Sequence, residues 1–124
     1  MTGPRGFAVS LTAAAAGVRL AWRGQPHFRF EVVAGAGAIA LALWLETGLT
    51  AVLVASSVVL VAEMVNTAVE ATVDLASPER RPLAAAAKDA AAGAVLIAAG
   101  FAVAIGLVAL GPALWARVTG AVVP

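Results

Sequence analysis

The chain contains no cysteine, and only 12% of its 124 residues carry a charge. The absence of cysteine excludes disulfides, zinc–thiolate sites and thiol catalysis. A net charge of +1 gives no indication of a nucleic-acid partner, and we expect none. The sequence also lacks a P-loop and the glycine-rich loop of soluble kinases. Any nucleotide site must therefore be built in another way.

Hydrophobic residues make up 62% of the chain, and its mean hydropathy is +0.98. Such a composition leaves too little polar surface to cover a soluble globule of this size. A spanning helix needs about 20 residues, so the length allows one domain with three spans. The sequence predicts an all-α integral membrane protein whose bundle needs more than one copy of the chain.

The first segment, residues 4–24, predicts an amphipathic helix that lies on the membrane surface. In a continuous helix its polar residues fall within roughly 40° of one another. These are Arg5, Thr12, Arg19 and Arg23. A signal peptide is the alternative, because an arginine precedes an alanine-rich run. Arg19 and Arg23 follow too closely for that, and no soluble mature domain comes after them.

Three further apolar segments predict membrane spans, and charges and prolines separate the last two. We expect spans at 28–49, 50–76 and 83–116, an aqueous loop at 77–82 and a tail at 117–124. The loop contains two prolines, which end the preceding helix and allow the next to begin. The three tryptophans are interpreted as interface anchors: Trp22, Trp44 and Trp115.

Basic residues gather on one side of the predicted membrane. They are Arg5, Arg19, Arg23 and Arg29 before the first span, and Arg80, Arg81 and Lys88 around the loop. The turn between the first two spans has none. The positive-inside rule therefore places the N-terminus and the 77–82 loop in the cytoplasm.

Four polar side chains interrupt the second span: Glu63, Asn66, Glu70 and Asp74. At 100° per residue they occupy an arc of roughly 80° on one helix face. Carboxylates at membrane depth are costly and rarely face lipid, so this acidic face predicts a site that binds a cation or moves a proton. The alternative is a structural role, in which these side chains form hydrogen bonds between helices and so determine how the bundle packs.

The acidic face leads from water into the bilayer. Asp74 lies at the cytoplasmic interface, and Glu63 is eleven residues deeper, about 16 Å along the axis. Carboxylate and amide oxygens suit Mg²⁺, which commonly bridges a protein carboxylate to substrate phosphates. Basic residues of the loop could hold phosphate oxygens that the metal leaves free. This combination favours phosphoryl transfer.

Three stretches resemble one protein family. They are Glu63-Met64-Val65-Asn66-Thr67-Ala68-Val69-Glu70-Ala71-Thr72-Val73-Asp74-Leu75, then Ser77-Pro78-Glu79 with Pro82-Leu83, and Lys88-Asp89-Ala90-Ala91-Ala92-Gly93-Ala94-Val95-Leu96. They are similar to the small integral-membrane bacterial diacylglycerol kinases and their undecaprenol kinase relatives. The agreement extends over about residues 17–99, and the tail after Leu110 lies outside it.

The resemblance implies transfer of the ATP γ-phosphate to the primary hydroxyl of a membrane lipid, with Mg²⁺, in the bacterial inner membrane. It also implies a homotrimer with active sites between protomers. By position, Glu63 is the general base and Glu70 a metal ligand, while Asn66 and Asp74 support them. The implied nucleotide-contacting residues are Glu79, Arg80, Arg81, Lys88 and Asp89.

One position departs from the family pattern. The family usually has a second metal-binding glutamate just after the surface helix, and this chain has Gln25 there. Glutamine keeps an oxygen donor but loses the charge, so we expect weaker Mg²⁺ binding than in a Gln25→Glu variant. Glu31 lies about 240° further around a continuous helix and is a poor substitute unless Pro26 bends the chain. A degenerate enzyme is the alternative.

Two functions from different classes remain. One is an ATP-dependent lipid kinase; the other is a small oligomer that conducts ions or protons along the acidic face. The basic loop and Lys88 favour the kinase, because a cation pathway gains nothing from phosphate-binding groups at its mouth. The sequence leaves open whether the acceptor is diacylglycerol or undecaprenol.

Overall fold

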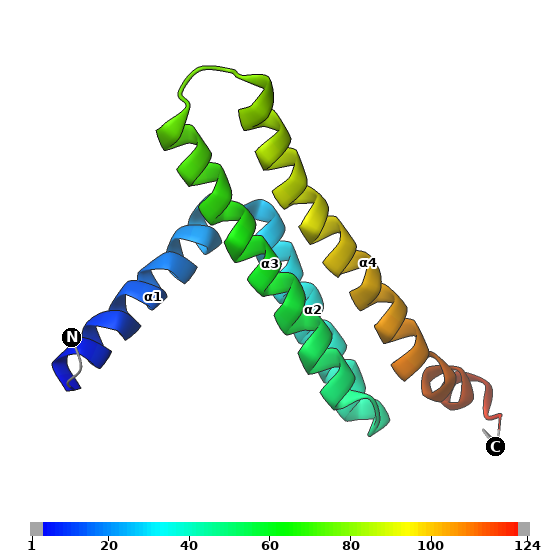
Figure 1. Ribbon diagram of the computed structural model, residues 1–124. Helices are drawn as coiled ribbons and strands as arrows, with labels where there is room; N and C mark the ends of the chain where they lie inside the picture. Colours follow the sequence, from blue (N-terminus) through cyan, green and yellow to red (C-terminus); the bar gives the residue numbers. More distant parts are fainter. Residues whose placement is uncertain (1–3, 122–124) are drawn as a thin grey trace.

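The computed structural model describes residues 4–121, which form four α-helices. They are α1 (Pro4–Gly24), α2 (Pro26–Leu45), α3 (Leu49–Ala76) and α4 (Pro82–Thr119). Helices α2, α3 and α4 run alongside one another, and α1 leaves this bundle at a wide angle (Figure 1). The expected all-helical fold is confirmed. Residues 122–124 of the expected tail and the side chain of Arg5 lie outside the described part.

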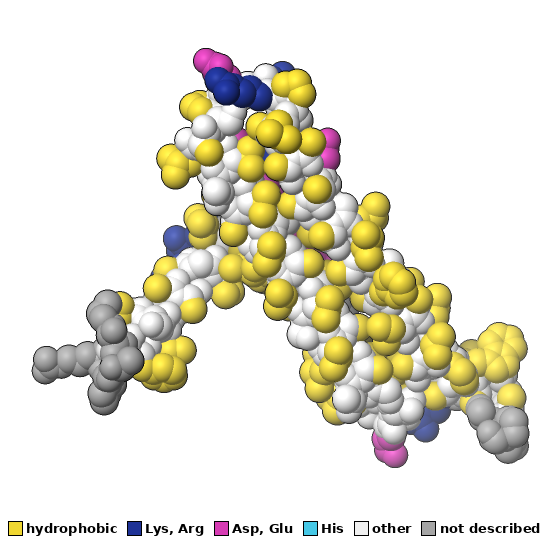
Figure 2. All heavy atoms as spheres, viewed as in Figure 1, with side chains coloured by type: hydrophobic (Ala, Val, Ile, Leu, Met, Phe, Trp, Pro, Cys, Tyr) yellow, Lys and Arg dark blue, Asp and Glu magenta, His cyan; other side chains and the backbone are white. Residues whose placement is uncertain are grey.

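Helices α2, α3 and α4 are each long and apolar enough to cross a membrane. Their outer surfaces carry large apolar side chains that no other part of the chain covers, such as Leu96 at 75% exposure and Phe101 at 68%. Hydrophobic atoms accordingly dominate the visible face of the bundle (Figure 2). Lipid can cover such a surface, whereas water cannot do so without a large free-energy cost. Three candidate spans therefore agree with the prediction from composition.

The chain breaks between α1 and α2 at Gln25, whose backbone is extended with φ −119° and ψ 103°. Pro26 then begins α2, because proline is favourable in a first helical turn but lacks the N–H that an interior position needs. The end of α1 packs on α3: Ala21 is buried, and a Cβ added at Gly17 would lie 3.8 Å from Met64 Cε. α2 thus starts two residues before the expected position, 28.

A tight turn joins α2 to α3. Glu46 and Gly48 both adopt left-handed backbone conformations, with φ 55° and 70°. A Cβ at Gly48 would lie 2.8 Å from Leu110 Cδ2, so both its conformation and its surroundings require glycine. α2 therefore ends at Leu45, whereas the sequence predicted a first span to 49. The buried cluster Ala42, Val52 and Leu110 packs beside this turn.

Helix α4 continues through Pro112 to Thr119, three residues beyond its expected end at 116. Its last turns reach α2: Arg117 Nη2 donates to the backbone oxygen of Trp44 at 3.0 Å, and its guanidinium lies 5.0 Å from the centre of the Trp44 ring. Residues 117–119 of the expected tail are thus helical. They tie the end of α4 to the end of α2.

The helices differ in length, and this difference positions the polar residues. α3 has 28 residues and α2 has 20, so α3 is about 12 Å longer. Because their ends meet at the 46–48 turn, the excess lies at the opposite end. There the last two turns of α3 and the start of α4 extend past the start of α2 and are joined by residues 77–81 (Figure 1).

Candidate functional site

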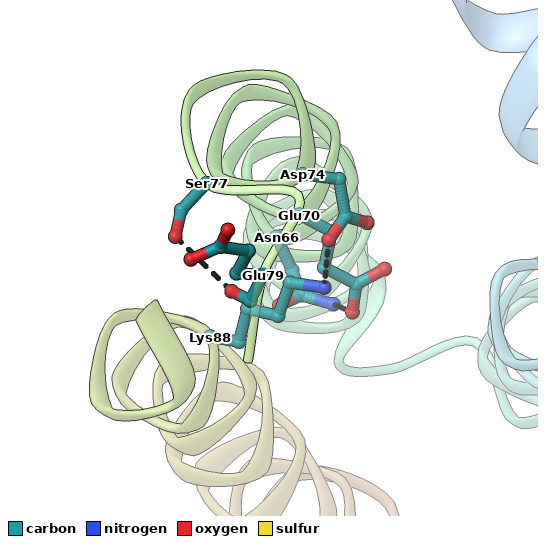
Figure 3. A network of polar contacts seen from close by, with 6 residues as sticks. All are labelled: Asn66, Glu70, Asp74, Ser77, Glu79 and Lys88. Atoms are coloured by element: carbon teal, nitrogen blue, oxygen red, sulfur yellow. Dashed lines mark hydrogen bonds and ion pairs between the residues drawn. The ribbon is translucent and has the colours of Figure 1, made fainter. Parts of the chain in front are cut away.

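The acidic face of α3 turns toward its neighbouring helices. Asn66 Nδ2 donates to Glu70 Oε1 at 3.0 Å, one turn along the helix. One turn further, Asp74 Oδ1 accepts from Lys88 Nζ of α4 at 2.5 Å. Figure 3 shows these side chains in succession, with Lys88 reaching across from α4. The four polar residues predicted to share one face thus lie in sequence along α3, and the outermost is paired with the basic end of α4.

Glu63 is the deepest member of the face and is 6% exposed. It is the one buried charged residue within 6–121, the range whose burial the structure describes. Met64, the next residue, faces the Gly17 region of α1, so the end of α1 covers this level of α3. A carboxyl group buried at this depth is usually paired with a polar or charged group, or takes part in binding or catalysis.

One amide oxygen at the centre of the face has no hydrogen-bond donor as a partner. Asn66 Oδ1 is buried without a hydrogen bond, while the amide nitrogen of the same side chain is committed to Glu70. A buried acceptor without a donor is uncommon in folded proteins and suits a cation. No group of three or more histidine, aspartate or glutamate side chains within 4–121 is arranged to hold a metal ion. The donors fit an ion that takes one or two carboxylates and completes its shell with phosphate oxygens and water, as Mg²⁺ does.

The C-terminal end of α3, the loop and the start of α4 line a cavity of about 430 Å³. Its polar lining consists of Asp74, Ser77, Glu79, Arg80, Arg81 and Lys88. Within the loop, Ser77 Oγ donates to the Glu79 backbone oxygen at 3.2 Å, and Arg81 pairs with Glu79 at 3.5 Å. Both members of that ion pair are mostly exposed, so they can turn toward a ligand at little cost. Basic and acidic groups predicted to act together therefore share one cavity.

Two predicted site residues lie apart from these contacts. Gln25 occupies the break between α1 and α2, and its side chain makes no capping hydrogen bond. None of the side-chain hydrogen bonds within 4–121 joins it to Glu70. Asp89 follows Lys88 on α4, is exposed and does not line the cavity.

Sequence reasoning missed the group that α2 brings to this site. His27 and Glu31, at the start of α2, join Glu70 as the ionisable groups whose charges act on Glu63. Counting 240° from Gln25 disfavoured Glu31, but that count assumed one continuous helix. The break at Gln25 and Pro26 gives α2 a direction different from that of α1. Pro26 was the feature of the sequence that could have indicated the position of Glu31. Glu31 also borders a groove of about 500 Å³ between α2, α3 and α4, whose walls are almost entirely apolar.

Comparison with known proteins finds relatives over most of the chain. A family model described as "Prokaryotic diacylglycerol kinase" matches residues 12–110. The diacylglycerol kinase of Escherichia coli (strain K12) is 45% identical over 85 residues, which cover 66% of this chain and 70% of that protein. The diacylglycerol kinase of Synechocystis sp. is 44% identical over 102 residues, 79% of this chain and 58% of that protein. The undecaprenol kinase of Bacillus subtilis (strain 168) is 54% identical over 52 residues, 42% of each chain.

Proposed function

The chain belongs to the prokaryotic diacylglycerol kinase family, and from this premise we propose that it transfers the γ-phosphate of ATP to the primary hydroxyl of a membrane lipid. Relatives named for diacylglycerol and for undecaprenol both match, so either alcohol is a candidate acceptor. One observation supports the proposal independently of family membership. A buried carboxyl at membrane depth and a basic cavity in water lie at the two ends of one polar helix face.

In the proposed reaction the lipid hydroxyl oxygen forms a bond to the γ-phosphorus, and the bond between that phosphorus and the ADP oxygen breaks. The hydroxyl proton passes to the Glu63 carboxylate as general base and later leaves to water. Glu63 suits this role because it is the buried acid of the face, where an alcohol carried by a lipid can arrive from the bilayer. Asn66 and Asp74 orient their neighbours Glu70 and Lys88 through the contacts described above.

The cavity at the cytoplasmic end is the proposed nucleotide site. Arg80, Arg81 and Lys88 supply the positive charge for the phosphates, and Glu79 an acceptor for the rest of the nucleotide. Asp89, which follows Lys88 but does not line the cavity, is proposed to contact the part of the nucleotide that extends beyond it. A guanidinium can bind a phosphate through two parallel hydrogen bonds, which also fixes its orientation. The cavity lies beside the 77–81 loop, between the end of α3 and the start of α4.

The proposed metal ligands are Glu70 and, from the α1–α2 break, Gln25, with Asn66 Oδ1 as an additional oxygen donor. Bound Mg²⁺ would neutralise charge on the phosphates as the γ-phosphoryl group moves. Glu70 is already oriented by the Asn66 amide, so its second oxygen remains available.

The groove between α2, α3 and α4 supports a lipid acceptor. It lies between three candidate spanning helices and is lined by small and apolar residues, Gly35, Ala55 and Gly100 among them. Glu31 stands at its border and also lies near Glu63. An acyl or prenyl chain in this groove would lead a terminal hydroxyl toward the acidic face.

We propose the bacterial inner membrane as the location, with the N-terminus and the 77–81 loop in the cytoplasm. The support is charge: the loop end of the bundle carries Arg80, Arg81 and Lys88, whereas the 46–48 turn carries no basic residue. ATP is cytoplasmic, so this orientation also brings the nucleotide cavity to its substrate. α1 would then lie on the inner surface with its arginines at the headgroups.

We propose a homotrimer on the basis of a second face of α3. Exposed residues recur on it at alternating spacings of four and three, as in a coiled-coil seam. They are Val54, Val58, Val61, Val65, Ala68, Thr72 and Leu75. β-branched residues at both seam positions favour more than two strands. This seam is opposite the acidic face, so self-association through α3 would leave Glu63 and Glu70 directed toward the other helices.

Transfer of radiolabelled phosphate from ATP to lipid in mixed micelles tests the proposed activity, with diacylglycerol and undecaprenol offered separately. Labelled lipid that requires Mg²⁺ is the expected result. The alternative, an ion- or proton-conducting oligomer, predicts no labelled lipid but a pH or ion flux in proteoliposomes. Conductance without phosphorylation would overturn the proposal.

A further inference from the structure

One serine hydroxyl in the groove between α2, α3 and α4 has no hydrogen-bond partner among the described residues. Ser56 of α3 lines this groove and is half-buried. Every other serine and threonine beyond the first turn of a helix within 4–121 donates to a backbone oxygen three or four residues earlier. These are Ser10, Thr12, Ser57, Thr67, Thr72 and Thr119. The Ser56 hydroxyl therefore remains available to a ligand in the groove.

The groove keeps space beside this hydroxyl. Gly35 of α2 faces it, and a Cβ added at Gly35 would lie 3.3 Å from Ser56 Oγ. An alanine there would press against the hydroxyl, whereas glycine leaves it room. Apart from Glu31 at its border, the other residues that line the groove are apolar or glycine. In ligand sites of this kind a few polar groups fix the orientation of an otherwise apolar ligand.

Ser56 lies on the helix face that also carries Glu63. The two residues are seven positions apart, which places them about 20° apart around the helix and about 10.5 Å apart along its axis. Ser56 is on the side away from the 77–81 loop, and so lies deeper in the proposed bilayer. Glu31 borders the groove and lies near Glu63. A lipid whose hydroxyl is at Glu63 and whose chain follows the groove therefore passes Ser56.

The two candidate acceptors differ in what they present at this depth. Diacylglycerol carries ester carbonyls a few bonds from its primary hydroxyl, whereas a polyprenol is pure hydrocarbon beyond its hydroxyl. Two hydrogen bonds of about 3 Å each, one at Glu63 and one at Ser56, account for a little over half of the axial spacing. The glycerol unit between the hydroxyl and an ester carbonyl spans the remainder. A polyprenol would instead leave the Ser56 hydroxyl unpaired in an apolar groove, which costs free energy.

We infer that Ser56 determines acceptor specificity: its hydroxyl donates a hydrogen bond to an ester carbonyl of diacylglycerol. This inference rests on the proposed function and names diacylglycerol as the preferred acceptor. The contact selects the ester-bearing lipid, because a site built around a hydrogen bond discriminates against an analogue that lacks the partner. It also fixes the depth of the lipid in the groove and thereby holds the primary hydroxyl at Glu63.

Kinetics with two acceptors of equal chain length test the contact. Dioleoylglycerol and its dioleyl diether have the same hydroxyl and the same chains, but the diether has no carbonyl. Wild-type enzyme should show a kcat/KM about fivefold higher for the diester, which corresponds to one hydrogen bond of ordinary strength. Ser56→Ala keeps the small side chain but should lose this preference through a fall in kcat/KM with the diester. Its kcat/KM for the diether and for a polyprenol should equal that of wild type.

The neighbouring serine provides the matched control. Ser57 is exposed, and its hydroxyl already donates to the Val54 backbone oxygen at 2.8 Å. Ser57→Ala removes the same group from the same helix turn, but on a side chain that does not line the groove. This variant should therefore retain the wild-type preference for the diester.

The hydrogen bond is also measured without ATP, so that its detection does not depend on catalysis. Dioleoylglycerol with isotope-labelled ester carbonyls is added to the purified protein in detergent, and the carbonyl stretch is followed by infrared difference spectroscopy. A band at lowered frequency, as a hydrogen-bonded carbonyl gives, should appear with wild type and with Ser57→Ala. The same band should be absent with Ser56→Ala.

The two measurements separate the role of Ser56 from the proposed function. Equal losses of kcat/KM with diester and diether in Ser56→Ala would overturn the inference and assign Ser56 a packing role. An unchanged diester preference in Ser56→Ala, or no shifted carbonyl band with wild type, would overturn it as well. Phosphate transfer to both lipids without an ester preference would refute the role of Ser56 and leave the proposed function standing. A carbonyl band that depends on Ser56, without any phosphate transfer, would refute the proposed function while the ester-binding site stands.

Discussion

Lys88 Nζ of α4 lies 2.5 Å from Asp74 Oδ1 of α3. The two residues are fourteen positions apart, and the 77–81 loop between them lines the same cavity. Their side chains are 36% and 66% exposed, so the pair contributes little to stability, on the order of 1 kcal/mol or less. Its consequence is positional: the ammonium group is fixed at the point where the acidic face meets the cavity.

Replacing Lys88 with methionine should therefore affect nucleotide use more than folding. Loss of one charge-assisted contact to a phosphate should lower kcat/KM for MgATP roughly 10- to 100-fold. The midpoint temperature of thermal unfolding should change little. Steady-state kinetics and thermal unfolding in the same detergent measure the two effects. A large fall in stability with unchanged kcat/KM would assign Lys88 a structural role instead.

Glu63→Gln should lower the rate of phosphate transfer about 10²- to 10⁴-fold, because an amide cannot accept the hydroxyl proton. The side chain keeps its size and stays buried, so formation of the proposed trimer should be almost unaffected. Glu46→Gln, in the turn between α2 and α3, is the matched control and should retain activity. Retained turnover in Glu63→Gln would remove this residue from the mechanism.

Gln25→Glu should lower the Mg²⁺ concentration that gives half-maximal activity, because it adds a negative charge to the proposed metal site. Glu70→Gln should raise that concentration and should be partly rescued by excess Mg²⁺. Activity is titrated with Mg²⁺ at fixed ATP for both variants and for wild type. An identical Mg²⁺ dependence of wild type and Gln25→Glu would refute a metal role for position 25.

Arg117→Ala should destabilise the protein by about 1 kcal/mol, since it removes both the cation–π contact and the hydrogen bond to the Trp44 carbonyl. That carbonyl lies in the last turn of α2, where backbone oxygens lack helical donors. Arg117→Lys should recover only part of the loss, because an ammonium lacks the planar fork. Thermal unfolding in detergent measures these differences. Equal midpoint temperatures for wild type, Arg117→Ala and Arg117→Lys would mean that the contact is not stabilising. Residue 117 is also outside the stretch matched by the family, 12–110.

Helix periodicity placed Glu63, Asn66, Glu70 and Asp74 on one face, and the prolines of the 77–82 segment located the end of α3. Both are local properties: residue spacing fixes side-chain direction within one helix, and proline acts on its own turn. The composition likewise required a membrane protein. The bounds of α2 were harder to predict, because the turn that ends it depends on a left-handed backbone at Glu46 and on the close approach of Leu110 and Ala109 of α4 to Gly48.

The sequence by itself determined that the chain is helical, that it suits a membrane and that an acidic face runs along one of its helices. Only the tertiary structure decided what faces that acidic helix. The approach of Glu31 and His27 to Glu63, the pairing of Lys88 with Asp74 and the hydrogen bond from Arg29 to the Trp22 backbone oxygen all join separate helices. Their relative positions follow from the direction the chain takes after a break such as Gln25, and from how helix surfaces pack. Neither quantity is encoded in the spacing of residues along a single helix.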